Sequence, residues 1–374
     1  MSVAWPLVLM PLLAAIVLAA VPHREAAGWI NFGAAIATFL LACRLPWELV
    51  ARPPFLIDRP AAHFVILAGF VAIAGAWFGR SGGRLQYAVF QLLLGFSLIA
   101  LLANSFFVAW IGIEASVIAT AVAIGLPLTT DAVAAAWRFF LPCAVGVALA
   151  LFGGVVLYFA ERSAFDGGLL NLAFALIAIG YGIIVVLAPM PGGVQLAPLL
   201  VILRMRALLA GHAEPLAPGP PLMALGLAAL LVTAFVLWRE SEKERRLEFA
   251  AVGQLGVAIF AFGVGSTAAV FAGLLQLTLL TVTRAAMLGW PLAMAGLFPS
   301  LFLIITATVE NTPWLVLPLG IGIAANAWVL LARSREIQMT ALAPALLLAV
   351  VVVLGIAMPG PLAGWFTAVA ASLQ

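Results

Sequence analysis

The feature that most constrains this chain is a series of apolar runs, each long enough to cross a lipid bilayer. A spanning α-helix needs about 20 mostly apolar residues. One such run, FFVAWIGIEASVIATAVAIGL at 106–126, contains a single charged residue, Glu114. Because the bilayer core offers no water to the backbone, only helices and closed barrels span it. The runs are continuous and not alternating, so they favour helices over a barrel.

The overall composition supports the same fold class. The chain of 374 residues is 66% hydrophobic and 8% charged, with a mean hydropathy of +1.24. A soluble domain carries roughly 25% charged residues, so this chain cannot present an ordinary aqueous surface. We therefore expect an all-α integral membrane protein that forms a single polytopic domain over 1–374.

The apolar runs predict about 14 transmembrane helices, with a range of roughly 12–14. The segments are 5–21, 27–43, 62–79, 85–103, 106–126, 133–160, 168–190, 194–211, 220–239, 247–265, 268–290, 291–309, 313–332 and 340–358. Turn residues separate them, as in RPPFLIDRP at 52–60. The tail at 360–374 is too short to span.

The loops between these segments indicate an orientation and one possible contact surface. Lys and Arg are more frequent in the odd-numbered loops than in the even-numbered ones, which predicts cytoplasmic odd loops and both termini on the outer side. The most polar loop is WRESEKERRLEF at 238–249. It is either a contact for a soluble partner or a solvated loop of the positive-inside type.

The sequence contains no pattern typical of a catalytic, metal or cofactor site. Two cysteines and three histidines are scattered along the chain without ligand spacing; they are Cys43, Cys143, His23, His63 and His212. The sequence also lacks a phosphate-binding loop and a nucleophile–base pair. The net charge of +3 reflects loop orientation and does not indicate nucleic-acid binding. We expect no cofactor, no metal and no nucleic-acid partner.

Three charged residues lie at membrane depth, where an ionisable group by default marks a function or a buried pair. They are Glu114, Arg138 and Arg284. Glu114 and Arg138 flank the connection at 125–132, and at 1.5 Å per residue their depths differ by roughly 6 Å. An ion pair between them is therefore plausible. It would act either as a proton-relay element or as a static bridge that fixes helix register.

Four stretches of the chain resemble the antiporter-like subunits of complex I, Mrp antiporters and membrane-bound hydrogenases. The nearest pattern is that of the F subunits of hydrogenase-4 and formate hydrogenlyase complexes. The stretches begin NSFFVAWIGIEASV at 104, IGYGIIVVLAPMPG at 179, RRLEFAAVGQLGVA at 245 and FAGLLQLTLLTVTR at 271. The resemblance covers 104–310, which it identifies as the proton-translocating module of such subunits.

The resemblance implies a mid-membrane line of Lys, His and Glu carried by broken helices, and this chain departs from that line. The family's Lys, His and acidic positions fall on Ile184, Gln276, Leu280, Arg284 and Ile305, and the broken-helix region is shortened to GGVQLAP at 192–198. Arg effectively cannot lose its proton, whereas a buried Lys can. We therefore interpret the chain as a degenerate paralogue that keeps Glu114 but lacks a complete proton path.

Three functions follow from these observations. The resemblance implies a membrane subunit, without a catalytic site of its own, of a complex I-like or hydrogenase-like redox complex in a bacterial-type inner membrane. Its partners would be other membrane subunits and the lipid bilayer. An alternative is an active proton or cation translocator that uses Glu114, Arg138, Arg284, Gln276 and bound water. A third possibility is a transporter that acts on its own.

Overall fold

The computed structural model describes residues 3–79, 82–163, 166–187, 194–211, 219–240, 242–285, 290–332, 351, 353–355 and 358–373. The chain divides into two compact units, Met1–His212 (unit 1) and Ala213–Gln374 (unit 2). The range 104–310 includes parts of both units. The single domain over 1–374 and the module over 104–310 remain predictions.

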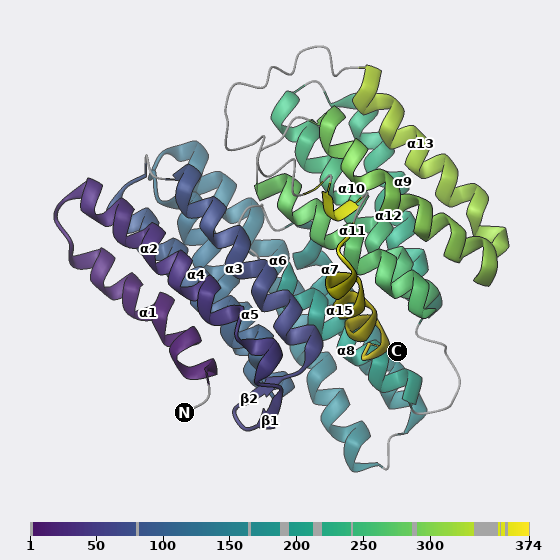
Figure 1. The fold of residues 1–374 in the computed structure, drawn as a ribbon, viewed down its shortest axis with the longest axis horizontal. Coiled ribbons are helices and arrows are strands. Elements are labelled where there is room, and N and C mark those ends of the chain that lie inside the picture. The colour runs from purple at the N-terminus through teal and green to yellow at the C-terminus, as the bar shows by residue number, and fades with distance from the viewer. Residues whose placement is uncertain are drawn as a thin grey trace. The chain divides into compact units, whose positions relative to one another are not determined.

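Unit 1 is built from eight named α-helices and one small β-hairpin (Figure 1). The elements are α1 (Ala4–Ala20), α2 (Arg24–Ala42), η1 (Leu45–Trp47), β1 (Val50–Arg52), β2 (Phe55–Ile57), α3 (Arg59–Phe78), α4 (Arg84–Leu102), α5 (Phe106–Gly125), α6 (Thr130–Arg162), α7 (Gly167–Leu187) and α8 (Leu196–Gly211).

The described part of unit 2 is entirely helical. Its elements are α9 (Gly219–Arg239), α10 (Lys243–Val264), α11 (Thr267–Ala285), α12 (Trp290–Asn311), η3 (Pro313–Leu315), α13 (Val316–Ala332) and α15 (Gly360–Ala371). The predicted span at 340–358 lies mostly outside the described residues.

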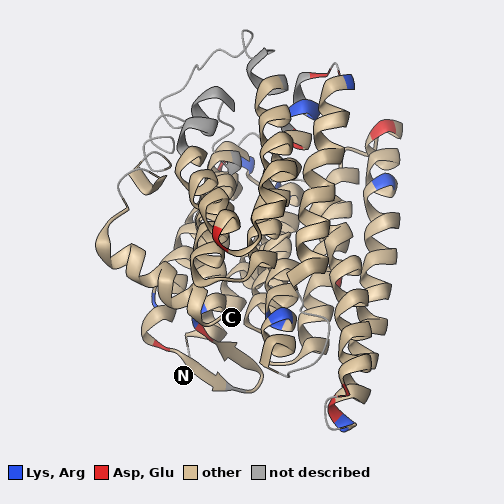
Figure 2. Ribbon diagram, turned by 90° about the vertical axis from the view of Figure 1, so that its right-hand side faces the viewer, with Lys and Arg blue, Asp and Glu red and all other residues tan. Residues whose placement is uncertain are grey.

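The helices confirm the prediction of an all-α membrane protein. Within the described residues, seven helices are long and apolar enough to cross a membrane, and several shorter apolar helices accompany them. The seven are Arg24–Trp47, Arg59–Phe78, Arg84–Leu102, Phe106–Gly125, Thr130–Arg162, Gly167–Leu187 and Gly219–Arg239. Charged residues lie mainly near helix ends (Figure 2). The total of about 14 spans stays a prediction.

Four of the helices in unit 1 begin at side-chain caps, and in α7 the cap is Asp166, which accepts from the Leu169 N–H at 2.9 Å. Asp58, Ser105 and Thr129 each accept a hydrogen bond from a backbone N–H in the first turn of α3, α5 and α6 respectively. A capping oxygen satisfies one of the donors that a helix start leaves without an intrahelical partner. These caps fix where the apolar runs enter the helical conformation.

The segment at 50–57 corrects the sequence interpretation of 52–60 as a simple turn. Strands β1 and β2 pair in antiparallel fashion, with Val50 opposite Ile57. Phe55 also forms an isolated bridge with Ala103, and its ring lies 5.0 Å from that of Trp5. The hairpin therefore packs against the α4–α5 connection and the start of α1 (Figure 1), an arrangement that the turn residues alone do not reveal.

Helices α5, α6 and α7 run antiparallel to their neighbours, and two contacts fix their register. The indole N–H of Trp110 in α5 donates to the carbonyl oxygen of Val147 in α6 at 2.9 Å. Farther along, Gly146 of α6 packs directly against the backbone of Gly180 in α7. Counting from these contacts, four residues after Trp110 bring Glu114 to the level of Cys143.

In unit 2, α9 and α10 approach each other through glycine. A Cβ atom on Gly226 would lie 2.5 Å from the Gly256 carbonyl oxygen, a distance that side-chain carbons do not tolerate. Beside this contact, Leu230, Val257 and Phe260 are almost fully buried in one apolar cluster. The absence of a side chain at Gly226 thus permits the close packing of the two helices.

Candidate functional site

Glu114 lies on α5 at the edge of the packed interior of unit 1. Its helix neighbour Ile113 is fully buried, whereas Ile111 and Ile118 on adjoining turns are 58% and 45% exposed. The Glu114 side chain is half-buried. Among the described residues, its carboxylate forms neither an ion pair nor a hydrogen bond.

The ion pair between Glu114 and Arg138 that the sequence suggested is not formed between these two described residues. Arg138 is exposed, and its Nε–H donates to the carbonyl oxygen of Ala134 at 3.3 Å. Side chains on an α-helix lean toward the helix N-terminus. Because α5 and α6 are antiparallel, Glu114 and Arg138 lean toward opposite ends, and the small difference in depth between their backbones increases.

Glu114 instead lies near two uncharged groups that sequence reasoning did not connect with it. Its charge acts on the thiol of Cys143 in α6 and on the hydroxyl of Tyr181 in α7. Tyr181 is 0% exposed. The glycine-rich stretch around Gly180 was noted only for its family resemblance, and no local pattern connected Tyr181 with Glu114.

Gln276, a sequence-predicted path residue, is the centre of a buried hydrogen-bonded chain in unit 2. Its amide Nε2–H donates to the Gln254 side-chain oxygen at 2.8 Å. Its own side-chain oxygen accepts from the Ser300 hydroxyl at 2.5 Å. All three side chains are 0% exposed. The chain crosses from α10 through α11 to α12 and consists of neutral groups only.

A second polar contact lies beside this chain. The Asn326 amide donates to the carbonyl oxygens of Leu230 and Gly322 at 3.0 and 2.9 Å. A Cβ on Gly253 would lie 2.8 Å from the Asn326 side-chain oxygen and 2.7 Å from the Thr233 hydroxyl. Sequence analysis named neither Gln254 nor Asn326, although each is an amide within an otherwise apolar run.

The other predicted path residue in this unit is Arg284. Its backbone belongs to α11 (Thr267–Ala285), and its side chain lies outside the described residues. Its proposed role as a path residue therefore remains a prediction.

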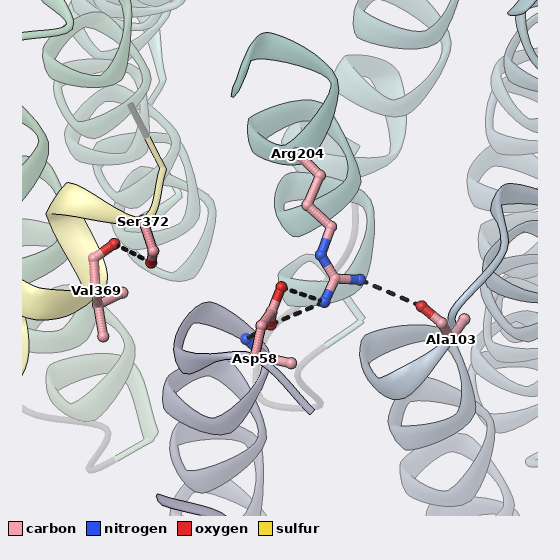
Figure 3. Close-up of polar contacts among 6 residues, drawn as sticks. Asp58, Ala103, Arg204, Val369 and Ser372 are labelled. Carbon is pink, nitrogen blue, oxygen red and sulfur yellow. Dashed lines mark hydrogen bonds and ion pairs between the residues drawn. The ribbon is translucent and has the colours of Figure 1, made fainter. Parts of the chain in front are cut away.

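An ion pair that the sequence did not predict joins α8 to α3. Arg204 donates from one terminal nitrogen to both carboxylate oxygens of Asp58 at 2.9 and 3.0 Å, and from the other to the Ala103 carbonyl oxygen at 3.3 Å. Figure 3 shows Arg204 between these two partners. Asp58 also caps α3. Arg204 and Arg206 both lie inside α8, which falls within the predicted segment 194–211.

The fold is that of known antiporter-like membrane subunits. A chain of the membrane-bound sulfane sulfur reductase, an archaeal respiratory membrane complex, superposes with a TM-score of 0.84 at 16% identity and covers 99% of this chain and 97% of that chain. A chain of the Mrp complex from Dietzia sp. DQ12-45-1b gives 0.77 at 16% identity, with 100% and 98% covered. Respiratory complex I from Thermus thermophilus gives 0.75 at 20% identity, with 100% of both chains covered.

The chain also has a relative that is similar in sequence along most of its length. The chain is 25% identical over 424 aligned positions to the hydrogenase-4 component F homolog of Methylacidiphilum infernorum (isolate V4), covering 88% of this chain and 89% of the relative. No protein-family model matches the chain. The structural and sequence similarities together support the antiporter-like fold of the Mrp and complex I type.

Proposed function

We propose that this chain is a membrane subunit of a multi-subunit redox complex, in which it serves a structural or auxiliary role and lacks a complete proton path of its own. The observation that carries this proposal is the chemistry of the polar side chains inside unit 2. Among its described residues, every buried polar side chain is an amide or a hydroxyl: Thr233, Gln254, Gln276, Thr278, Thr281, Thr283, Ser300, Thr308 and Asn326.

Amides and hydroxyls order water and form hydrogen bonds, but they do not gain or lose protons near neutral pH. A relay through membrane-embedded protein requires groups that titrate or an unbroken line of water between such groups. Two hydrogen bonds join the Gln254, Gln276 and Ser300 side chains to one another across three helices. They therefore support a role in holding α10, α11 and α12 together.

The similar proteins suggest the kind of assembly to which this chain belongs. The similar proteins are a hydrogenase-4 component F homolog and chains of respiratory and Mrp complexes, so we place this chain among the membrane subunits of such an assembly. We further propose that both termini lie on the outer side of a bacterial-type inner membrane. In this orientation the 238–249 loop would face the cytoplasm, where a soluble subunit would meet the exposed Trp238.

Purification of the full chain from its native membrane tests this assignment. Mild solubilisation followed by affinity capture is expected to recover iron–sulfur and hydrogenase-like subunits in fixed stoichiometry. A chain that purifies alone and transports an ion in that state would contradict membership of a complex and support a transporter that acts on its own.

The alternative function is an active proton or cation translocator that uses Glu114. Its support is that this half-buried carboxylate has no ion-pair partner among the described residues, so its proton is not held by a fixed cation. Glu114→Gln separates the two proposals in the assembled complex. A translocating subunit loses coupled proton movement while the complex still assembles, whereas an auxiliary subunit retains it. Glu161→Gln, at the exposed end of α6, is the matched control.

A further inference from the structure

The hydroxyl of Tyr181 is a buried polar group without a partner in the described part of the chain. The side chain is 0% exposed, and its oxygen has no hydrogen-bond partner among the described residues. Buried hydroxyls are almost always hydrogen-bonded in folded proteins. An unpartnered one requires an explanation, and an ordered water is one of the recognised explanations.

The register of three helices brings Tyr181 to the level of Glu114. The Trp110–Val147 hydrogen bond aligns Glu114 with Cys143. The contact between Gly146 and Gly180 aligns Tyr181 with the residue two positions after Cys143. At 1.5 Å per residue, these groups therefore lie within about 3 Å of one another along the helix axes.

Water is the simplest group that can join these side chains. Glu114 acts electrostatically on both Tyr181 and Cys143, yet it forms no direct hydrogen bond with either among the described contacts. Polar groups that lack a direct hydrogen bond to one another are commonly bridged by water. A buried water needs two to four polar partners, and the carboxylate, phenol and thiol supply three.

We propose that one ordered water molecule is held between Glu114, Tyr181 and Cys143, so that Tyr181 is the hydrogen-bonding partner of the Glu114 carboxyl group through that water. The phenol donates to the water, and the water donates to the carboxylate. Ile184, one turn after Tyr181, is fully buried and apolar, so this position of α7 offers no side-chain cation. The bridge goes beyond the proposed auxiliary function and is compatible with either role of Glu114.

High-resolution electron microscopy of the intact complex tests the bridge. Density for one water is expected within hydrogen-bond distance of both the Glu114 carboxylate and the Tyr181 hydroxyl. It should disappear in Tyr181→Phe and persist in Tyr158→Phe, which removes the same atom from an exposed ring on α6. A dry gap, or a direct contact between the two side chains, would overturn the proposal.

Infrared difference spectroscopy provides a second measurement that needs no map of the variant. The carboxylate stretching band of Glu114 is assigned by its loss in Glu114→Gln. A weakly bound water O–H band that shifts in H₂¹⁸O is expected in the wild-type protein and should be lost in the same variant. In Tyr181→Phe the carboxylate band should move because its hydrogen-bonding changes. A carboxylate band that is unchanged in Tyr181→Phe, with no isotope-sensitive water band, would contradict the bridge. Neither result depends on whether the chain conducts protons.

Discussion

At the scale of single residues, three buried polar side chains of unit 2 form a connected set. Gln276 both donates to Gln254 and accepts from Ser300, so its replacement changes the environment of two other buried polar groups. Removing one partner of a buried hydrogen bond leaves the other without a partner, which costs about 1–3 kcal/mol. The hydrogen bonds of Gln276 are therefore expected to contribute to the free energy of unfolding.

Gln276→Leu is expected to lower the free energy of unfolding by about 1–3 kcal/mol, because it leaves the Gln254 oxygen and the Ser300 hydroxyl without this partner. Thermal unfolding of the purified protein in detergent measures the effect. Thr306→Ala on the same helix as Ser300 is the control, since Thr306 is exposed and bonds only to its own helix at Phe302. Equal effects of the two variants would show that the chain of side chains adds no stability.

Sequence reasoning identified Glu114 because a charged group in an apolar run is visible without coordinates, and it identified Gln276 because the family resemblance places a path position there. It did not find Tyr181, because a tyrosine in such a run is equally typical of an apolar core or a membrane interface. It was wrong about the Glu114–Arg138 pair because depth along the helices was counted from the backbone alone. The direction in which each side chain leans decides whether two groups at similar depth meet.

At the scale of secondary-structure elements, the Asp58–Arg204 contact fixes α8 against the rest of unit 1. Asp58 has two functions, since it both caps α3 and accepts from Arg204. Both side chains are partly exposed, at 32% and 22%, so the charge interaction is moderated by solvent. The cap and the ion pair can be separated by mutation.

Asp58→Asn keeps a capping oxygen and loses the charge, whereas Asp58→Ala loses both. We expect Asp58→Ala to be less stable than Asp58→Asn by about 1 kcal/mol, the usual value of an N-cap. Chemical denaturation of both variants measures the difference. Glu242→Gln, in the fully surface-located pair with Arg245, should change stability by roughly 0.5 kcal/mol or less. An Asp58→Asn variant as unstable as Asp58→Ala would assign the whole effect to the ion pair.

The contact between α9 and α10 gives a prediction about packing. Gly226→Ala would place a methyl group 2.5 Å from both the Gly256 carbonyl oxygen and the Phe260 nitrogen, and overpacking of this kind costs about 1–3 kcal/mol. Gly320→Ala in α13 meets nothing within 4 Å. Because Ala favours the helix by about 0.5–1 kcal/mol, this control should be neutral or stabilising. Comparable melting temperatures for the two variants would exclude close packing at Gly226.

The positions of the helices followed from the lengths of the apolar runs, since lipid requires each run to satisfy its own backbone. Two features did not follow. The hairpin at Val50–Ile57 depends on pairing with Ala103, a residue far away in the sequence. The ion pair between Arg204 of α8 and Asp58 joins residues that are far apart in the sequence, so the apolar runs do not predict it.

At the scale of the whole molecule, an antiporter-like fold is combined with neutral amides and hydroxyls at the buried polar positions that are described in unit 2. The fold rests on full-length similarity to chains of respiratory and Mrp complexes. The role rests on the neutral amides and hydroxyls of unit 2 and on the isolated carboxylate of unit 1. Together they support the proposal that this chain, without neighbouring subunits, does not carry protons across a membrane.

Proton flux into vesicles that contain only this chain tests this proposal most directly. With a pH-sensitive dye inside the vesicles and a potassium-diffusion potential as the driving force, the account predicts a rate equal to that of protein-free vesicles, for the wild-type chain and for Glu114→Gln alike. Rapid flux through the wild-type chain that Glu114→Gln abolishes would contradict it.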